Sequence, residues 1–269
     1  MALSPSFSIP ILLILSISIT TSASDHWNIL SFLSSDNYKN TLSFNLKNYC
    51  ESWRMNVELH NILDFDVIPG ECINYISKYM TSSQYKADIQ RATEEASLFL
   101  TKNFINGFDD LDAWIFDIDD TLLSTLPYYQ KYHFGGDDCC KEEKTNRVLL
   151  EAWMEEANAP AVEHMVRFYN EIKERGFKIF LISSRGEHLR DATINNLIKA
   201  GYHGWTQLTL RCEDDEKHGI EEYKANQRKK LIKQGYRLWG NIGDQWSSLN
   251  GHSYARRSFK LPNPMYYEA

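Results

Sequence analysis

The second half of the chain alternates short apolar runs with amphipathic helical patterns, and this alternation restricts the folds available to it. The apolar runs occupy residues 114–116, 178–182, 208–210 and 238–242. Between the first two runs, apolar residues recur at the spacing of one helical face: Val162, Met165, Val166, Tyr169 and Ile172. Short apolar strands that alternate with helices are typical of a parallel sheet covered on both faces, so we predict a three-layer α/β fold.

Residues 44–106 lack this alternation and carry helical patterns instead. Amphipathic faces are supplied there by Tyr75, Tyr79 and residues 87–104. We therefore expect an N-terminal helical extension over residues 24–110, packed on an α/β core formed by residues 111–269.

The beginning of the chain has the composition of a targeting segment. Residues 9–19 are apolar apart from two serines and a proline, and the small residues that follow end in Ala23. This pattern predicts a signal peptide of residues 1–23, the secretory pathway, and the vacuole or the extracellular space as destination. The alternative is a buried or membrane helix, but Pro10 interrupts the run and its length is short for a bilayer. No later segment reaches membrane-spanning length, so we expect no membrane association after cleavage.

Secretion would make the five cysteines candidates for disulfides, and an odd number leaves at least one unpaired or shared between chains. Cys50 and Cys72 flank a compact helical stretch and are the preferred pair. Cys139 and Cys140 are adjacent, so each is expected to find a different partner or none. The sequence has no Cys-x-x-Cys motif, which argues against a zinc site.

The formal net charge of -7 limits the class of partner. A nucleic-acid backbone requires a basic face, so nucleic acid is not expected as a partner. A small phosphate ester remains compatible with an acidic protein, because local cations can hold it.

Polar residues follow three of the predicted strands. Asp117 and Asp119 follow the first strand, Ser183 and Arg185 follow the second, and Asp244 follows the last. Functional residues of an open parallel sheet collect at the carboxyl ends of its strands. Carboxylates from two strand ends can therefore converge on one divalent cation, and a hydroxyl from a third can bind an anion.

Asp117 and Asp119 are separated by one residue, so they can serve one site in different ways. The side chain of Asp117 and the backbone carbonyl of Asp119 can both reach a metal, which leaves the Asp119 side chain for proton transfer. A carboxylate that attacks phosphorus forms an aspartyl-phosphate. The alternatives are a solvated acidic turn and a calcium loop; the calcium loop fails because Leu122 and Tyr128 stand where it needs glycine and glutamate.

Five segments together resemble one protein family. They are Asn48–Arg54, Trp114–Ser124, Pro127–Tyr129, Gly240–Trp246 and Phe259–Tyr267. The set resembles the haloacid dehalogenase superfamily of phosphotransferases, and more closely its plant branch of acid phosphatases and vegetative storage proteins. The resemblance covers about residues 44–267 and implies a haloacid dehalogenase-like fold.

The resemblance also implies roles for individual residues. Asp117 matches the nucleophile and Asp119 the general acid and base, which protonates the leaving group and then activates water. Asp117, Asp119 and Asp244 match the ligands of Mg²⁺. Ser183 matches a hydroxyl that binds the transferring phosphoryl group, and Lys224 a cation that stabilises nucleophile and phosphate.

Other interpretations of single residues stay open. Ser183 alone is equally suited to capping the following helix, and Lys224 alone to a solvated helix face. Asp244 alone is compatible with an ordinary turn. Arg185 is a candidate for substrate contact, with a surface salt bridge as an equal alternative.

One position departs from the branch pattern. The branch usually has a second acid four residues after the aspartate that Asp244 matches, and here that position is Ser248. Such an acid would orient metal-bound water or a metal ligand, and losing a partner of this kind typically costs about 10- to 100-fold in metal affinity or activity.

From these residues and this resemblance we predict a magnesium-dependent acid phosphatase of the plant type that acts on small phosphomonoesters. A small cap is expected at about residues 126–159, where aromatic side chains either line the mouth of the site or pack: Tyr128, Tyr129, Tyr132 and Phe134. The alternative is a storage protein with weak or incidental phosphatase activity. The sequence leaves the oligomeric state open, a homodimer included.

Overall fold

The computed structural model describes residues 42–65, 67–104, 109–135, 143–215 and 217–269. The chain divides into residues 1–43, of which only Leu42 and Ser43 are described, and a compact unit of residues 44–269. The predicted signal peptide and the cysteines at 139 and 140 lie outside the described residues. No helix among those described is long and apolar enough to cross a membrane.

A five-stranded sheet forms the centre of the unit, with strand order β3-β2-β1-β4-β5 and every neighbouring pair parallel. The strands are β1 (Asp112–Phe116), β2 (Lys178–Gly186), β3 (Gln207–Arg211), β4 (Arg237–Gly243) and β5 (Arg257–Lys260). The predicted parallel α/β fold is confirmed. β5 was not predicted, because only one of its four residues, Phe259, is buried and the strand lacks an apolar run.

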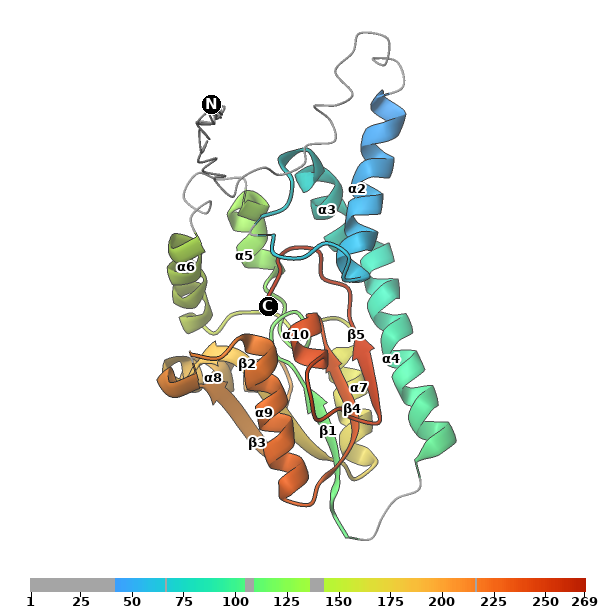
Figure 1. Ribbon diagram of the computed structural model, residues 1–269, viewed down its shortest axis with the longest axis vertical. Coiled ribbons are helices and arrows are strands. Elements are labelled where there is room, and N and C mark those ends of the chain that lie inside the picture. Colours follow the sequence, from blue (N-terminus) through green and yellow to red (C-terminus); the bar gives the residue numbers. More distant parts are fainter. Residues whose placement is uncertain (1–41, 66, 105–108, 136–142, 216) are drawn as a thin grey trace, which may run out of the picture. The chain divides into compact units, whose positions relative to one another are not determined.

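Side chains of β1 alternate between the two faces of the sheet. Trp114 and Phe116 enter the larger hydrophobic core with Tyr169 of α7 (Met165–Glu174), whereas Ile115 enters a smaller core with Tyr223 of α9 (Ile220–Lys233). Helices therefore cover both faces, with α9 on one side and α7 on the other (Figure 1). Between β2 and β3 the chain forms α8 (Arg190–Lys199).

The centre of the larger core depends on a glycine in β4. A Cβ at Gly240 would lie 2.2 Å from the ring of Trp114, so only glycine leaves room for the indole. Trp114 then stacks on Phe259 of β5 with ring centroids 5.8 Å apart. The edge strand is thus packed through an aromatic contact that crosses β4.

Helices that precede β1 share this core. They are α2 (Leu42–Glu58), α3 (Ile73–Met80) and α4 (Ser83–Asn103), as the helical patterns predicted. Phe104, which follows α4, lies 4.3 Å from Phe177 and 5.1 Å from Trp239 between ring centroids. The helical segment is therefore packed on the sheet through aromatic side chains.

Among the described residues between β1 and α7 are the helices α5 (Leu126–Lys131) and α6 (Glu143–Glu155). The hydroxyl of Tyr128 donates a 2.6 Å hydrogen bond to the side chain of Asn146, which joins α5 to α6. Short elements complete the unit: α10 (Trp246–Leu249) and the 3-10 helices η1 (Gly70–Cys72), η2 (His133–Gly135), η4 (Glu187–Leu189) and η5 (Glu213–Asp215).

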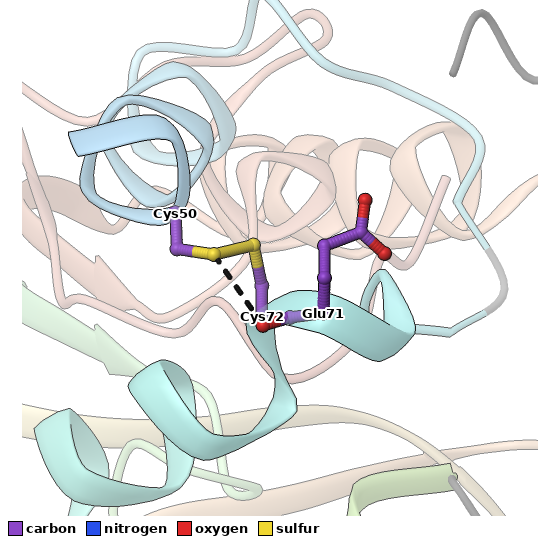
Figure 2. Close-up of a disulfide and its surroundings, with 3 residues drawn as sticks. All are labelled: Cys50, Glu71 and Cys72. Atoms are coloured by element: carbon purple, nitrogen blue, oxygen red, sulfur yellow. Dashed lines mark hydrogen bonds between the residues drawn. A yellow bond between two sulfur atoms is a disulfide. The ribbon is translucent and has the colours of Figure 1, made fainter. Parts of the chain in front are cut away.

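A disulfide joins Cys50 of α2 to Cys72 at the end of η1, as the sequence predicted (Figure 2). Both cysteines are buried, and the bridge fixes α2 against the turn that leads into α3. Cys212 is a free and exposed cysteine.

Replacing Cys50 and Cys72 together by serine should lower the free energy of unfolding by about 3 kcal/mol, because the bridge closes a loop with a sequence separation of 22 residues. Urea denaturation followed by circular dichroism measures the change. Cys212→Ser is the control and should change stability by less than about 0.5 kcal/mol. An equal loss in both variants would contradict a stabilising role for the bridge.

Candidate active site

The register of the sheet brings three of its strand ends to one edge. Phe116 at the end of β1 pairs with Leu181 of β2 and with Ile242 of β4. The residues just beyond these positions, Asp117 and Asp244 among them, therefore lie close together, as the strand pattern predicted.

Asp117 is held by a cation, a hydroxyl and a backbone N–H. Its Oδ2 accepts a 2.6 Å hydrogen bond from Nζ of Lys224 and a second hydrogen bond from the hydroxyl of Ser248. Its Oδ1 accepts the backbone N–H of Ile118 at 2.8 Å. Because the side chain is only 6% exposed, these donors supply most of the solvation of the carboxylate.

Lys224 comes from α9 and is 2% exposed. Burial alone would lower its pKa, but the carboxylates of Asp117 and Glu268 outweigh burial and raise the pKa above its ordinary value. Lys224 is therefore a buried, charged side chain rather than part of a solvated helix face.

Asp119 is held by Arg185. The guanidinium donates from Nε at 2.9 Å and from a terminal nitrogen at 2.7 Å to the two carboxylate oxygens of Asp119. Another terminal nitrogen donates to the hydroxyl of Thr193. Arg185 is buried, so its ion pair is internal and not the surface salt bridge that was one of its two interpretations.

Asp244 follows β4 and is surrounded by uncharged polar groups. Asn263 donates to its Oδ2 at 2.7 Å, the hydroxyl of Tyr266 donates to the same oxygen at 3.2 Å, and Thr121 donates to Oδ1 at 3.3 Å. Burial and the nearby charge of Asp117 raise the pKa of Asp244 well above its ordinary range. The donors of these three hydrogen bonds are all uncharged, and the nearby charge of Lys260, which acts to lower the pKa, does not offset burial and the neighbouring carboxylates.

Asp120, which the sequence analysis did not single out, supports the same turn. It accepts hydrogen bonds from the backbone N–H of Thr125 at 3.0 Å and from the Thr125 hydroxyl. The hydroxyl of Tyr266 lies 3.0 Å from the same carboxylate and shares its single proton between Asp120 and Asp244. Burial raises the pKa of Asp120. Tyr266 thus bridges Asp120 and Asp244 and ties the last residues of the chain to two strand ends.

These groups suit a hard divalent cation. In the part of the chain that the structure describes, no three side chains of His, Cys, Asp or Glu are placed to hold a metal ion together. A cation at this edge would therefore take the carboxylates of Asp117 and Asp244 and add backbone oxygens or water. Oxygen ligands of this kind are what Mg²⁺ prefers, and a cation would compensate the buried charge of Asp244.

Ser183 and Ser184 are neighbours in β2, but their side chains have different surroundings. β2 extends to Gly186, so both serines lie within the strand and not after it. Ser183 is fully buried, and its hydroxyl accepts the backbone N–H of Arg185 at 3.2 Å. The residue that precedes η4 is Gly186, so Ser183 caps no helix. Ser184 lines the adjacent cleft instead.

The cleft has a volume of about 580 Å³ and opens beside the strand ends. Its walls include Asp119, Tyr129, Ser184, Arg185, Tyr266 and Glu268. Tyr129 of α5 stacks on Tyr266 with ring centroids 5.4 Å apart. Among the four aromatic residues expected in the cap, only Tyr129 lines this cleft, and Tyr128 and Phe134 are buried in packing contacts.

Glu268 was also absent from the predicted site. The hydroxyl of Ser184 donates to its Oε1 at 2.6 Å, and Nζ of Lys224 lies 3.5 Å from its Oε2. Burial raises the pKa of Glu268, although Lys224 acts in the opposite direction. The segment Phe259–Tyr267 had been singled out for its resemblance, but the sequence pattern gave no reason to place the next residue in the site.

The family model of HAD superfamily, subfamily IIIB (acid phosphatase), matches residues 36–269. The chain belongs to this family. Acid phosphatase 1 of Solanum lycopersicum is 42% identical over 218 residues, which cover 81% of this chain and 83% of the relative. Vegetative storage protein 2 of Arabidopsis thaliana is 39% identical over 231 residues, which cover 85% of this chain and 83% of the relative.

The fold has a relative among solved structures. The class C acid phosphatase from Bacillus anthracis superposes with a TM-score of 0.59 at 23% identity, covering 72% of this chain and 84% of that one. Membership of the acid phosphatase family and the haloacid dehalogenase-like fold, both implied by the sequence resemblance, are therefore confirmed.

The structure places Ser248, the position at which the sequence resemblance led us to expect an acid, against Asp117. Its hydroxyl donates to Asp117 and accepts from Nζ of Lys224 at 2.8 Å. α10 carries Ser248 this close because Gly243 has no side chain: a Cβ there would lie 2.8 Å from Cβ of Ser248 and 3.5 Å from Cβ of Asp117.

Gly243→Ala should therefore push α10 away from β1 and lower the free energy of unfolding by about 1–3 kcal/mol, the usual range for overpacking. Gly70→Ala is the matched control, because a Cβ at Gly70 meets nothing within 4 Å. Thermal unfolding of both variants measures the difference. Equal stabilities would show that Gly243 is not required by the contact between Ser248 and Asp117.

Proposed function

We propose that this chain is a magnesium-dependent acid phosphatase that hydrolyses small phosphomonoesters through an aspartyl-phosphate on Asp117. The observation that carries the proposal is the geometry of Asp117: its carboxylate lies at a strand end, contacts a buried lysine, and is followed two residues later by a second, oriented carboxylate. Membership of the acid phosphatase family supports the same reaction.

In the first half of the reaction, a carboxylate oxygen of Asp117 attacks phosphorus and the bond from phosphorus to the ester oxygen breaks. Asp119 donates a proton to the departing oxygen, which leaves as an alcohol. Lys224 stabilises the negative charge of the nucleophile and of the phosphoryl group.

In the second half, the Asp119 carboxylate accepts a proton from a water molecule that attacks the acyl phosphate. The products are inorganic phosphate and the free carboxylate of Asp117. Arg185 positions the ionised Asp119 for this second proton transfer, because its two parallel hydrogen bonds fix the plane of the carboxylate. Substrate contact by Arg185, and phosphoryl binding by Ser183, remain part of this proposal.

The Asp117 and Asp244 side chains and the backbone carbonyl of Asp119 would hold Mg²⁺. When bound, the ion supplies positive charge that offsets the repulsion between the nucleophile and the anionic ester. The buried disulfide supports the secretory pathway as the location, because such bridges persist in oxidising compartments.

Storage is the second candidate function. It is favoured by the relatives named as vegetative storage proteins and by the serine at position 248. If the protein serves storage, the fold is retained, and hydrolysis of phosphate esters is slow or incidental.

Asp117→Asn should abolish hydrolysis of an aryl phosphate, because an amide cannot form the acyl phosphate. Asp119→Asn should slow turnover by about 10²- to 10⁴-fold, the usual contribution of general acid–base catalysis, and phospho-enzyme should accumulate. Steady-state rates and mass spectrometry of acid-quenched protein provide the measurements.

Asp64→Asn is the matched control, because Asp64 is an exposed carboxylate on the rim of the same cleft. It should retain parental activity. A phosphoryl adduct trapped on any residue other than Asp117 would refute the proposed nucleophile.

Ser248→Asp should tighten Mg²⁺ binding by about 10- to 100-fold, because a carboxylate in contact with Asp117 is tolerated best when a cation lies between them. Ser248→Asn has the same shape without the charge and serves as the control. The rise in melting temperature on adding Mg²⁺ should be larger for Ser248→Asp than for the parent or the control. If the aspartate and asparagine variants respond equally, position 248 does not limit metal binding.

A further inference from the structure

The last four residues of the chain cross the cleft at the strand ends. The backbone carbonyl of Tyr266 accepts a 3.2 Å hydrogen bond from the amide of Gln245, and the backbone N–H of Glu268 donates to the same side chain at 3.3 Å. On the far side, the carbonyl of Ala269 accepts the N–H of Ile220 at 3.0 Å. These contacts with the loop after β4 and with the start of α9 place Glu268 between two fixed points.

The Glu268 carboxylate is held by donors of the kind that bind a phosphoryl group. One oxygen accepts the Ser184 hydroxyl at 2.6 Å, and the other lies 3.5 Å from the ammonium of Lys224. The same ammonium donates to Asp117 at 2.6 Å. An anionic group that approaches Asp117 from the cleft would meet this hydroxyl and this cation, and Glu268 already occupies both.

Glu268 also separates the nucleophile from the cleft. Glu268 and Ser184 form part of the cleft wall, whereas Asp117 and Lys224, both described, do not. The side chain of Glu268 is 23% exposed, against 6% for Asp117 and 2% for Lys224. A phosphate ester in the cleft therefore meets the carboxylate of Glu268 before it meets the carboxylate of Asp117.

We propose that Glu268 is a built-in competitor of the phosphate ester: its carboxylate occupies the position of the phosphoryl group and must leave before a substrate reaches Asp117. This inference rests on the proposed phosphatase function of the site. It adds a residue that limits substrate access and that the family resemblance did not indicate.

The contact is suited to reversible displacement. Glu268 shares Lys224 with Asp117, and the Lys224–Glu268 distance of 3.5 Å is longer than that of a close ion pair. Burial is the main reason why the pKa of Glu268 is raised, and repulsion by the charges of Asp117 and Asp119 raises it further. An incoming phosphate replaces one anion by another. The apparent affinity for phosphate is therefore the intrinsic affinity multiplied by the fraction of molecules in which Glu268 has left the position.

Glu268→Gln tests the inference directly, because the amide retains the size of the side chain and an acceptor for Ser184 but loses the charge. Isothermal titration calorimetry with inorganic phosphate should show binding that is about tenfold tighter than in the parent, provided that the carboxylate occupies the position about nine-tenths of the time. Glu268→Ala should tighten binding at least as much. Glu174→Gln removes an exposed glutamate from α7 and should leave the affinity unchanged.

Steady-state kinetics with an aryl phosphate provide a second measurement. A competitor raises KM without changing kcat, so Glu268→Gln should lower KM by the same factor and leave kcat unchanged. A fall in kcat would overturn the inference, because it would show that Glu268 assists the reaction. Unchanged or weaker phosphate binding in both Glu268 variants would also overturn it.

The outcome separates this inference from the proposed function. If the parent binds phosphate and hydrolyses the ester but the Glu268 variants behave like the parent, only the competitor is refuted. If neither the parent nor the Glu268 variants bind phosphate or hydrolyse the ester, the phosphatase function itself is refuted, and the inference with it.

Discussion

Lys224 places an ammonium group 2.6 Å from Asp117 inside the protein, and the rest of the site is arranged around this ion pair. Burying either charge alone would cost several kcal/mol, so each partner is tolerated in the core because the other is present. The pair also links two elements that are distant in sequence, since Asp117 follows β1 and Lys224 belongs to α9. A substitution that removes one partner therefore affects the packing of α9 on the sheet as well as the chemistry.

Carboxylates outnumber cations around this pair, and this excess of negative charge favours the binding of further positive charge. Burial and mutual repulsion raise the pKa of Asp120, Asp244 and Glu268, while Arg185 is already committed to Asp119. Such a cluster can bind a divalent cation or take up protons, and both responses reduce the same repulsion. Metal affinity and acidity are therefore coupled in this site.

Local patterns predicted the parts of the site that follow strands. Asp117 and Asp244 were found because an apolar run precedes each of them and parallel strands share one edge. Glu268 and Tyr266 could not be found in this way, because their segment has no regular structure and reaches the site through long-range contacts. Ser184 was not singled out, because the strand extends beyond its apolar run and only this extension places the Ser184 side chain at the cleft.

The glycine in β4 that makes room for Trp114 also restricts how the sequence can vary. A side chain at position 240 would overlap the indole, so a larger residue there requires a smaller one at position 114. Such an exchange would also remove the ring that stacks on Phe259 and supports the edge strand. Positions 114, 240 and 259 are therefore expected to change together during divergence, as a covarying set that spans three strands.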